Sequence, residues 1–145
     1  LVTWGILEQL VTSNIVLPSS VIMKRSWVER NGNFREDLRN GEDLEYWFRL
    51  GAAGARFAYT NKILLYRYKQ PDSLSGDNPV TYTNHIKALK YCKDTAISKN
   101  HKKLISVINR SILFSWFYLM RLCVRHRMWK EVFIVSFRTC MYLID

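Results

Sequence analysis

The chain has 145 residues, of which 48% are hydrophobic and 14% aromatic, and its formal net charge at pH 7 is +10. A chain of this length and composition can bury the core of one domain, which excludes an intrinsically disordered protein. Its cysteines are odd in number and widely spaced, which argues against a disulfide framework or a cysteine metal site. We expect three free thiols in a reducing compartment: Cys92, Cys123 and Cys140.

Short helices and a strand are predicted for the beginning of the chain. Residues 6–11 have the apolar spacing of a short helix. Pro18 fixes an extended entry, and the sequence SSVIMKR at 19–25 then predicts a buried strand. Ser26 is suited to cap a second short helix, which Gly32 ends.

An amphipathic helix is predicted from Glu42, with a left-handed stop at Gly54. Glu42 and Asp43 lie in its first turn, where the helix dipole favours carboxylates. The same dipole keeps an aspartate ionised, as a general base requires. The residues alone therefore leave two interpretations open, an ordinary helix start or a catalytic one.

Two strand candidates follow this helix. They cover residues 55–60 and 62–68, and Asn61 provides the turn between them. Residues 69–79 are rich in turn-forming residues and close the first half of the chain.

Three helices are predicted after Pro79, over residues 80–98, 101–125 and 128–144. The apolar run 112–120 is shorter than the roughly 20 residues that a bilayer span requires. We therefore expect these helices to pack as a helical hairpin or to lie in a membrane interface.

The positive charge is concentrated in these helices. Residues 1–79 contain 10 basic and 9 acidic residues, whereas residues 80–145 contain 12 basic and 3 acidic residues. A basic, aromatic-rich segment of this kind suggests contact with anionic lipid or another polyanion. The alternative is a solvated basic face that covers a helical bundle.

Five motifs occur in a fixed order between residues 13 and 77. They are the strand SSVIMKR, the Gly-x-Phe turn at Gly32, the acidic pair that opens EDLEYWFRL, the Gly-x-x-Phe segment at Gly54, and a Tyr-Arg strand followed by SLS. In this order they resemble the C-terminal half of the catalytic domain of family 2 glycosyltransferases. The resemblance implies an α/β fold, namely a partial GT-A (Rossmann-like) domain over residues 1–79 followed by a basic α-helical tail over residues 80–145.

The resemblance also implies a function, the inverting transfer of a sugar from a nucleotide-sugar donor to a glycan or lipid-linked acceptor. The general base of the family maps onto Asp43, which would take the proton of the acceptor hydroxyl. Glu42 and Trp47 would border the acceptor. For Trp47, however, the apolar stripe that it shares with its neighbours favours packing in the core.

The donor diphosphate would lie against Arg67, Lys69 and Ser73. Lys69 stands near the place where members of the family often carry a metal-binding histidine, and a charged lysine offsets phosphate charge without ligating a metal. The alternative is a solvated lysine in a polar loop. The sequence contains no Asp-x-Asp motif, which supplies the family's ligands for Mg²⁺ or Mn²⁺. We expect a divalent metal in a full-length enzyme and no sugar transfer by this piece alone.

A second class of function is a non-catalytic module that binds a membrane surface or a partner through residues 80–145, on a degenerate transferase fold. Each Lys or Arg near an anionic membrane contributes about 1 kcal/mol. Many transferases of the family that the sequence resembles act on acceptors at the cytoplasmic leaflet, so the resemblance implies a cytoplasmic protein, peripheral at the inner face of the membrane. Nucleic-acid binding is suggested by the charge alone, without a recognised motif, and we expect none.

Overall fold

The computed structural model describes residues 5–66, 68 and 78–144. These residues form α-helices and one short 3-10 helix, Pro18–Ser20, and no strand is found among them. The α-helices are α1 (Gly5–Ser13), α2 (Arg25–Asn31), α3 (Glu42–Ala52), α4 (Pro79–Ser98), α5 (Lys102–Arg125) and α6 (Trp129–Ile144).

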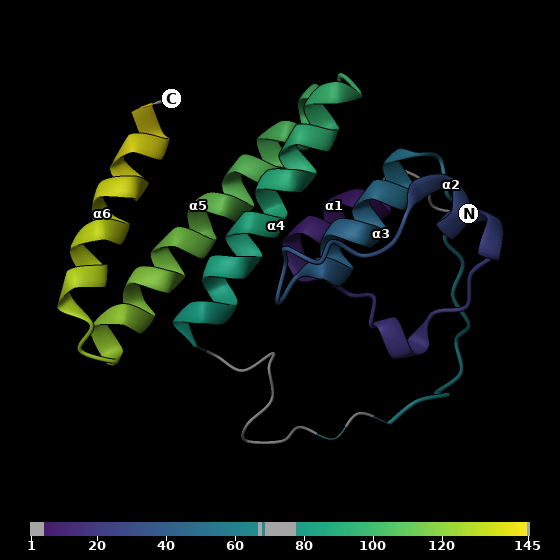
Figure 1. Ribbon diagram of the computed structural model, residues 1–145, viewed down its shortest axis with the longest axis horizontal. Helices are drawn as coiled ribbons and strands as arrows, with labels where there is room; N and C mark the ends of the chain where they lie inside the picture. The colour runs from purple at the N-terminus through teal and green to yellow at the C-terminus, as the bar shows by residue number, and fades with distance from the viewer. Residues whose placement is uncertain (1–4, 67, 69–77, 145) are drawn as a thin grey trace.

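The three long helices lie side by side, with α5 between α4 and α6 (Figure 1). On the side of α4 and α5 away from α6, α1 packs on α5 and α3 packs on α4, and α1 and α3 also contact each other. α6 therefore forms the outer edge of the fold and packs on α5.

One hydrophobic core joins both parts of the chain. α3 contributes its three large aromatic residues, Tyr46, Trp47 and Phe48, and α1 contributes Leu7 and Leu10. The helices α4 and α5 contribute further fully buried residues: Leu89, Cys92, Ile108 and Ile112. Residues before and after Pro79 are thus packed together, because the buried stripes of α1 and α3 are covered by α4 and α5.

The three predicted C-terminal helices are confirmed within a few residues at each end. Asn78 caps α4, since its side-chain oxygen accepts a hydrogen bond from the Thr81 amide at 2.9 Å, and Pro79 occupies the first turn. The helix from Glu42 is also confirmed, and Gly54 follows it in the left-handed region with φ 93°.

The predicted α/β fold is wrong, because the described residues form helices and no sheet. The resemblance to the GT-A domain of family 2 glycosyltransferases, which rested on strands at 19–25 and 55–68, is therefore overturned. At the first of these segments, a 3-10 helix occupies Pro18–Ser20 and α2 already begins at Arg25. A β-prone sequence becomes a strand only where another strand accepts its backbone hydrogen bonds.

In the second predicted strand region, Ala55 and Phe57 pack against the core, and residues 58–66 are exposed. Residues 58–66 form no backbone hydrogen bond with the rest of the described chain. Their apolar side chains face solvent, with 79% of Ile63 exposed. The composition of this segment is β-prone, but the described chain offers it no neighbouring strand.

Candidate functional site

The predicted catalytic pair lies at the amino end of α3, where α1 and α4 approach it. Asp43 is half-buried, and its Oδ1 accepts hydrogen bonds from Asn14 Nδ2 at 3.2 Å and from the Leu44 amide at 2.7 Å. Glu42 is also half-buried, and its Oε2 has no hydrogen-bond partner among the described residues. The carboxylate of Asp43 thus helps to fix α1 against α3.

His85 of α4 lies near this carboxylate. Burial lowers the pKa of His85, and the negative charge of Asp43 opposes that effect. The imidazole is therefore neutral at neutral pH. Gly41 precedes α3 with φ 84°, and a Cβ there would lie 3.0 Å from the Cβ of Ala88. A glycine at this position lets the start of α3 pack closely against α4.

A general-base role of Asp43 stays a prediction. One oxygen of its carboxylate already accepts two hydrogen bonds, and the neutral imidazole of His85 lies nearby. Among the described residues, no group of three His, Cys, Asp or Glu side chains could hold a metal ion. The expected Mg²⁺ or Mn²⁺, the nucleotide-sugar donor and the acceptor also stay predictions.

Of the other predicted site residues, Trp47 lies one helical turn after Asp43 but is buried, and the rest lie outside the described residues. Trp47 is 2% exposed, and its indole N–H donates a hydrogen bond to the Val16 carbonyl at 3.1 Å. Its ring also contacts Phe34 and Tyr46. Trp47 therefore packs in the core. The predicted diphosphate-binding residues all lie outside the described residues: Arg67, Lys69 and Ser73.

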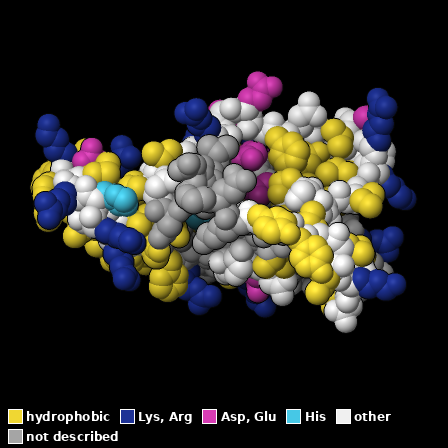
Figure 2. Space-filling view, turned by 90° about the horizontal axis from the view of Figure 1, so that it is seen from below, with side chains coloured by type: hydrophobic (Ala, Val, Ile, Leu, Met, Phe, Trp, Pro, Cys, Tyr) yellow, Lys and Arg dark blue, Asp and Glu magenta, His cyan; other side chains and the backbone are white. Residues whose placement is uncertain are grey.

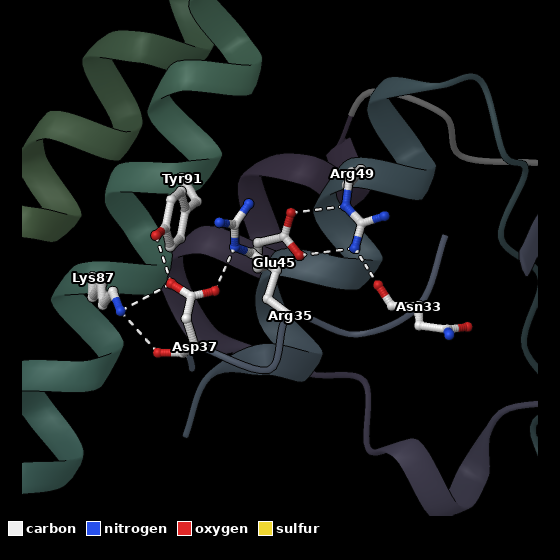
Figure 3. A network of polar contacts seen from close by, with 7 residues as sticks. All are labelled: Asn33, Arg35, Asp37, Glu45, Arg49, Lys87 and Tyr91. Atoms are coloured by element: carbon white, nitrogen blue, oxygen red, sulfur yellow. Dashed lines mark hydrogen bonds and ion pairs between the residues drawn. The ribbon is translucent and has the colours of Figure 1, made fainter. Parts of the chain in front are cut away.

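Asp37 is the centre of a polar network that sequence reasoning missed (Figure 3). Its carboxylate accepts hydrogen bonds from the Tyr91 hydroxyl at 2.6 Å and from Arg35 Nε at 3.0 Å, and it pairs with Lys87 Nζ at 2.9 Å. Lys87 also donates to the Asp37 carbonyl at 2.8 Å. These contacts fasten the loop before α3 to α4. The sequence holds no local signal for them, because the α4 partners lie about 50 residues further along the chain.

The stability of the protein should depend on pH through Asp37. Hydrogen bonds from Tyr91, Lys87 and Arg35 hold the pKa of this carboxyl well below its usual range. As the pH falls, Asp37 therefore binds a proton in the unfolded chain before it does so in the folded protein. Its contribution to the free energy of unfolding is complete above about pH 4 and is lost in more acidic solution.

We expect the urea midpoint of the wild type to exceed that of Asp37→Asn at pH 6, and the difference to shrink between about pH 4 and pH 2. Urea titrations monitored by circular dichroism at several pH values would measure it. A difference that stays constant over this range would contradict the assignment.

A second candidate site is the outer surface of α5 and α6. Large apolar side chains of α6 are exposed at successive helical turns: Trp129, Phe133, Phe137 and Met141. α5 exposes Phe114, Phe117 and Val124. Where α5 and α6 meet, at the left of Figure 2, Lys and Arg side chains lie among hydrophobic ones. The buried face of α6 is formed by Val135 and Thr139.

Among the described helices, α5 alone is long and apolar enough to cross a membrane. A core helix of a soluble protein meets the same criteria of length and composition. Eight residues of α5 are buried, and the helix packs on α1, α4 and α6. We therefore treat α5 as a packed helix whose outer face is exposed.

The cysteines give no reactive centre inside the fold. Burial raises the pKa of the Cys92 and Cys123 thiols, which keeps them protonated and unreactive. Cys140 is exposed on α6, and all three cysteines are free, as expected from the sequence.

The chain was compared with models of protein families, with curated proteins and with solved structures, and none of them matches it.

Proposed function

We propose that residues 80–145 form a helical module that binds the surface of an anionic membrane. The observation that carries this proposal is the orientation of α6. A surface helix normally turns its apolar face to the core and its polar face to water. α6 instead presents its largest apolar side chains outward, with Phe133 77% exposed.

The aromatic residues of α6 suit a membrane interface. Trp129, Phe133 and Phe137 lie four residues apart, so they share one face of the helix. An amphipathic helix of this kind lies with its apolar face about 5–10 Å below the headgroups. Tryptophan in particular favours this boundary, because its ring is apolar while its N–H stays near polar groups.

The charge of the module favours an anionic bilayer over a neutral one. α5 contains five basic residues and no acidic residue: Lys102, Lys103, Arg110, Arg121 and Arg125. In α6, Lys130 and Arg138 border the apolar face and are exposed. Each such cation near an anionic surface contributes about 1 kcal/mol.

Nucleic acid is the other common polyanion, and the outer face of α6 argues against it. Binding to nucleic acid uses cations for the phosphates and aromatic rings that stack on unpaired bases. It gives no role to the exposed non-aromatic residues of the same helix, Ile134, Met141 and Leu143. A membrane accounts for both the charge and the apolar row.

The proposal is tested by cosedimentation with vesicles of phosphatidylglycerol and phosphatidylcholine in a 1:3 ratio. We expect the wild type to bind them and to bind pure phosphatidylcholine much more weakly. Burying one large apolar side chain contributes about 1.5–3 kcal/mol. Trp129→Ser combined with Phe133→Ser should therefore lower the partition coefficient at least about tenfold.

The matched control is Tyr59→Ser combined with Ile63→Ser, which removes two comparably exposed apolar residues outside α5 and α6. This control should bind like the wild type. Failure of the wild type to bind anionic vesicles, or equal losses in the two variants, would contradict the proposal.

A further inference from the structure

The turn between α5 and α6 combines charge and exposed aromatic surface at one end of the module. We call residues 125–130 the basic turn. α5 ends at Arg125, Arg127 follows with a left-handed φ of 55°, and α6 begins at Trp129. Backbone hydrogen bonds close the turn, from the Arg127 amide to the Val124 carbonyl at 3.0 Å and from the Met128 amide to the Cys123 carbonyl at 2.9 Å. The turn is therefore a fixed part of the hairpin.

The cations of the basic turn are not used inside the protein. Arg125, Arg127 and Lys130 are exposed, and none of them forms an ion pair or hydrogen bond through its side chain within the described part of the chain. The lysines of α4 differ, since Lys87 pairs with Asp37 and Lys93 lies 5.1 Å from the centre of an aromatic ring.

Little negative charge opposes these cations. Glu131 is the one acidic residue in the sequence between residues 95 and 144. Arg121 is exposed one helical turn before the basic turn and adds to its charge. A concentration of unpaired guanidinium groups is suited to phosphate, because the planar group donates two parallel hydrogen bonds to phosphate oxygens.

The opposite end of the helices has similar charge without exposed aromatic side chains among the described residues. Lys99, Lys102 and Lys103 are exposed around the turn between α4 and α5, and we call them the far lysines. The large apolar residues exposed toward this end are aliphatic, namely Ile97 of α4 and Leu143 near the end of α6. At the basic turn, by contrast, Trp129 is 66% exposed and Phe133 follows one helical turn later. Cationic and aromatic side chains therefore coincide at the basic turn.

We infer that the basic turn binds the phosphates of anionic lipid headgroups while Trp129 enters the boundary of the acyl chains. This inference rests on the proposed membrane function and adds a tilt to it: the apolar face of α6 enters the bilayer with its Trp129 end deepest, and the helices rise from the membrane toward the turn between α4 and α5. The far lysines then lie about 36 Å away along the 24 residues of α5. That distance is several Debye lengths at physiological salt, where the Debye length is about 8 Å.

The test compares two variants that remove the same charge. The turn variant carries Arg125→Gln, Arg127→Gln and Lys130→Gln. The far variant carries Lys99→Gln, Lys102→Gln and Lys103→Gln. Partition coefficients are measured on the 1:3 phosphatidylglycerol vesicles at 150 mM salt, after circular dichroism has shown equal helix content and equal urea midpoints.

We expect the turn variant to bind about 100-fold more weakly than the wild type and the far variant to stay within about threefold of it. Equal losses in the two variants would overturn the inferred orientation and leave membrane binding itself in place, as for a module that lies flat on the bilayer. A wild type that does not bind the vesicles would overturn the proposed function instead.

Discussion

Replacing Arg49 by methionine is expected to lower the free energy of unfolding by about 3–5 kcal/mol, because it leaves a buried carboxylate without its partner. Glu45 is 3% exposed, and Arg49 binds it through Nε at 2.8 Å and Nη2 at 3.1 Å (Figure 3). Arg49 also donates hydrogen bonds to the carbonyls of Asn31 and Asn33 and so ties the end of α2 to α3. Urea unfolding at pH 7 would measure the loss.

The chain contains a matched control for this prediction. Arg25 and Glu29 of α2 form an ion pair of the same spacing, with a distance of 2.9 Å, but both side chains are exposed. Solvent screens such a pair, so Arg25→Met should cost less than about 0.5 kcal/mol. Similar losses for Arg25→Met and Arg49→Met would contradict the role given to burial.

A second variant separates burial of the charge from loss of packing. The double variant Glu45→Met with Arg49→Met removes both charges and keeps apolar volume, so it should recover part of the stability lost in Arg49→Met alone. A double variant that recovers no stability would show that the unpaired carboxylate is not the cause of the loss. The loss would then come from other contacts of Arg49, such as its packing on Tyr46, whose ring centre lies 4.9 Å from the guanidinium carbon.

Trp47→Ala should also lower the free energy of unfolding by about 3–5 kcal/mol. The ring is buried against Phe34 and Tyr46, and its N–H donates a hydrogen bond to the Val16 carbonyl. The substitution would leave a cavity and a carbonyl without its hydrogen bond, and both effects destabilise. Thermal and urea unfolding of the variant would measure the loss.

The control is Trp129→Ala, which removes the same ring from an exposed position and should change stability by less than about 1 kcal/mol. Vesicle binding should show the opposite pattern to stability, because Trp129→Ala removes an exposed ring and weakens binding. A Trp47→Ala protein as stable as the wild type would contradict the core assignment.

Local sequence signals predicted the helices well. The proline that opens α4, the periodic apolar residues of α3 and the glycine after it all act within one or two turns of the chain. One cap was assigned wrongly: Ser26 was predicted to begin α2, but the helix begins at Arg25 and Lys24 precedes it without a side-chain cap. A difference of this size at a helix end is common, because the terminal hydrogen bonds are weak.

The predicted strands are wrong because a strand needs hydrogen bonds from a second strand elsewhere in the chain. The predicted strands at 19–25, 55–60 and 62–68 are β-prone in composition, and no strand is found beside them in the described chain. A helix satisfies its backbone groups within its own segment, whereas a strand needs another strand for the same purpose. The order of motifs that suggested a glycosyltransferase could not supply that information.

The sequence by itself determined where the long helices lie, that the cysteines are free, and that positive charge is concentrated after residue 79. The tertiary structure decided which faces of those helices are buried. It joined Asp37 to Lys87 and Tyr91, placed Trp47 in the core, and left the apolar face of α6 uncovered. These outcomes depend on the side on which each helix meets its neighbours. Helical periodicity shows which residues form an apolar stripe, but it does not show which element, if any, covers that stripe.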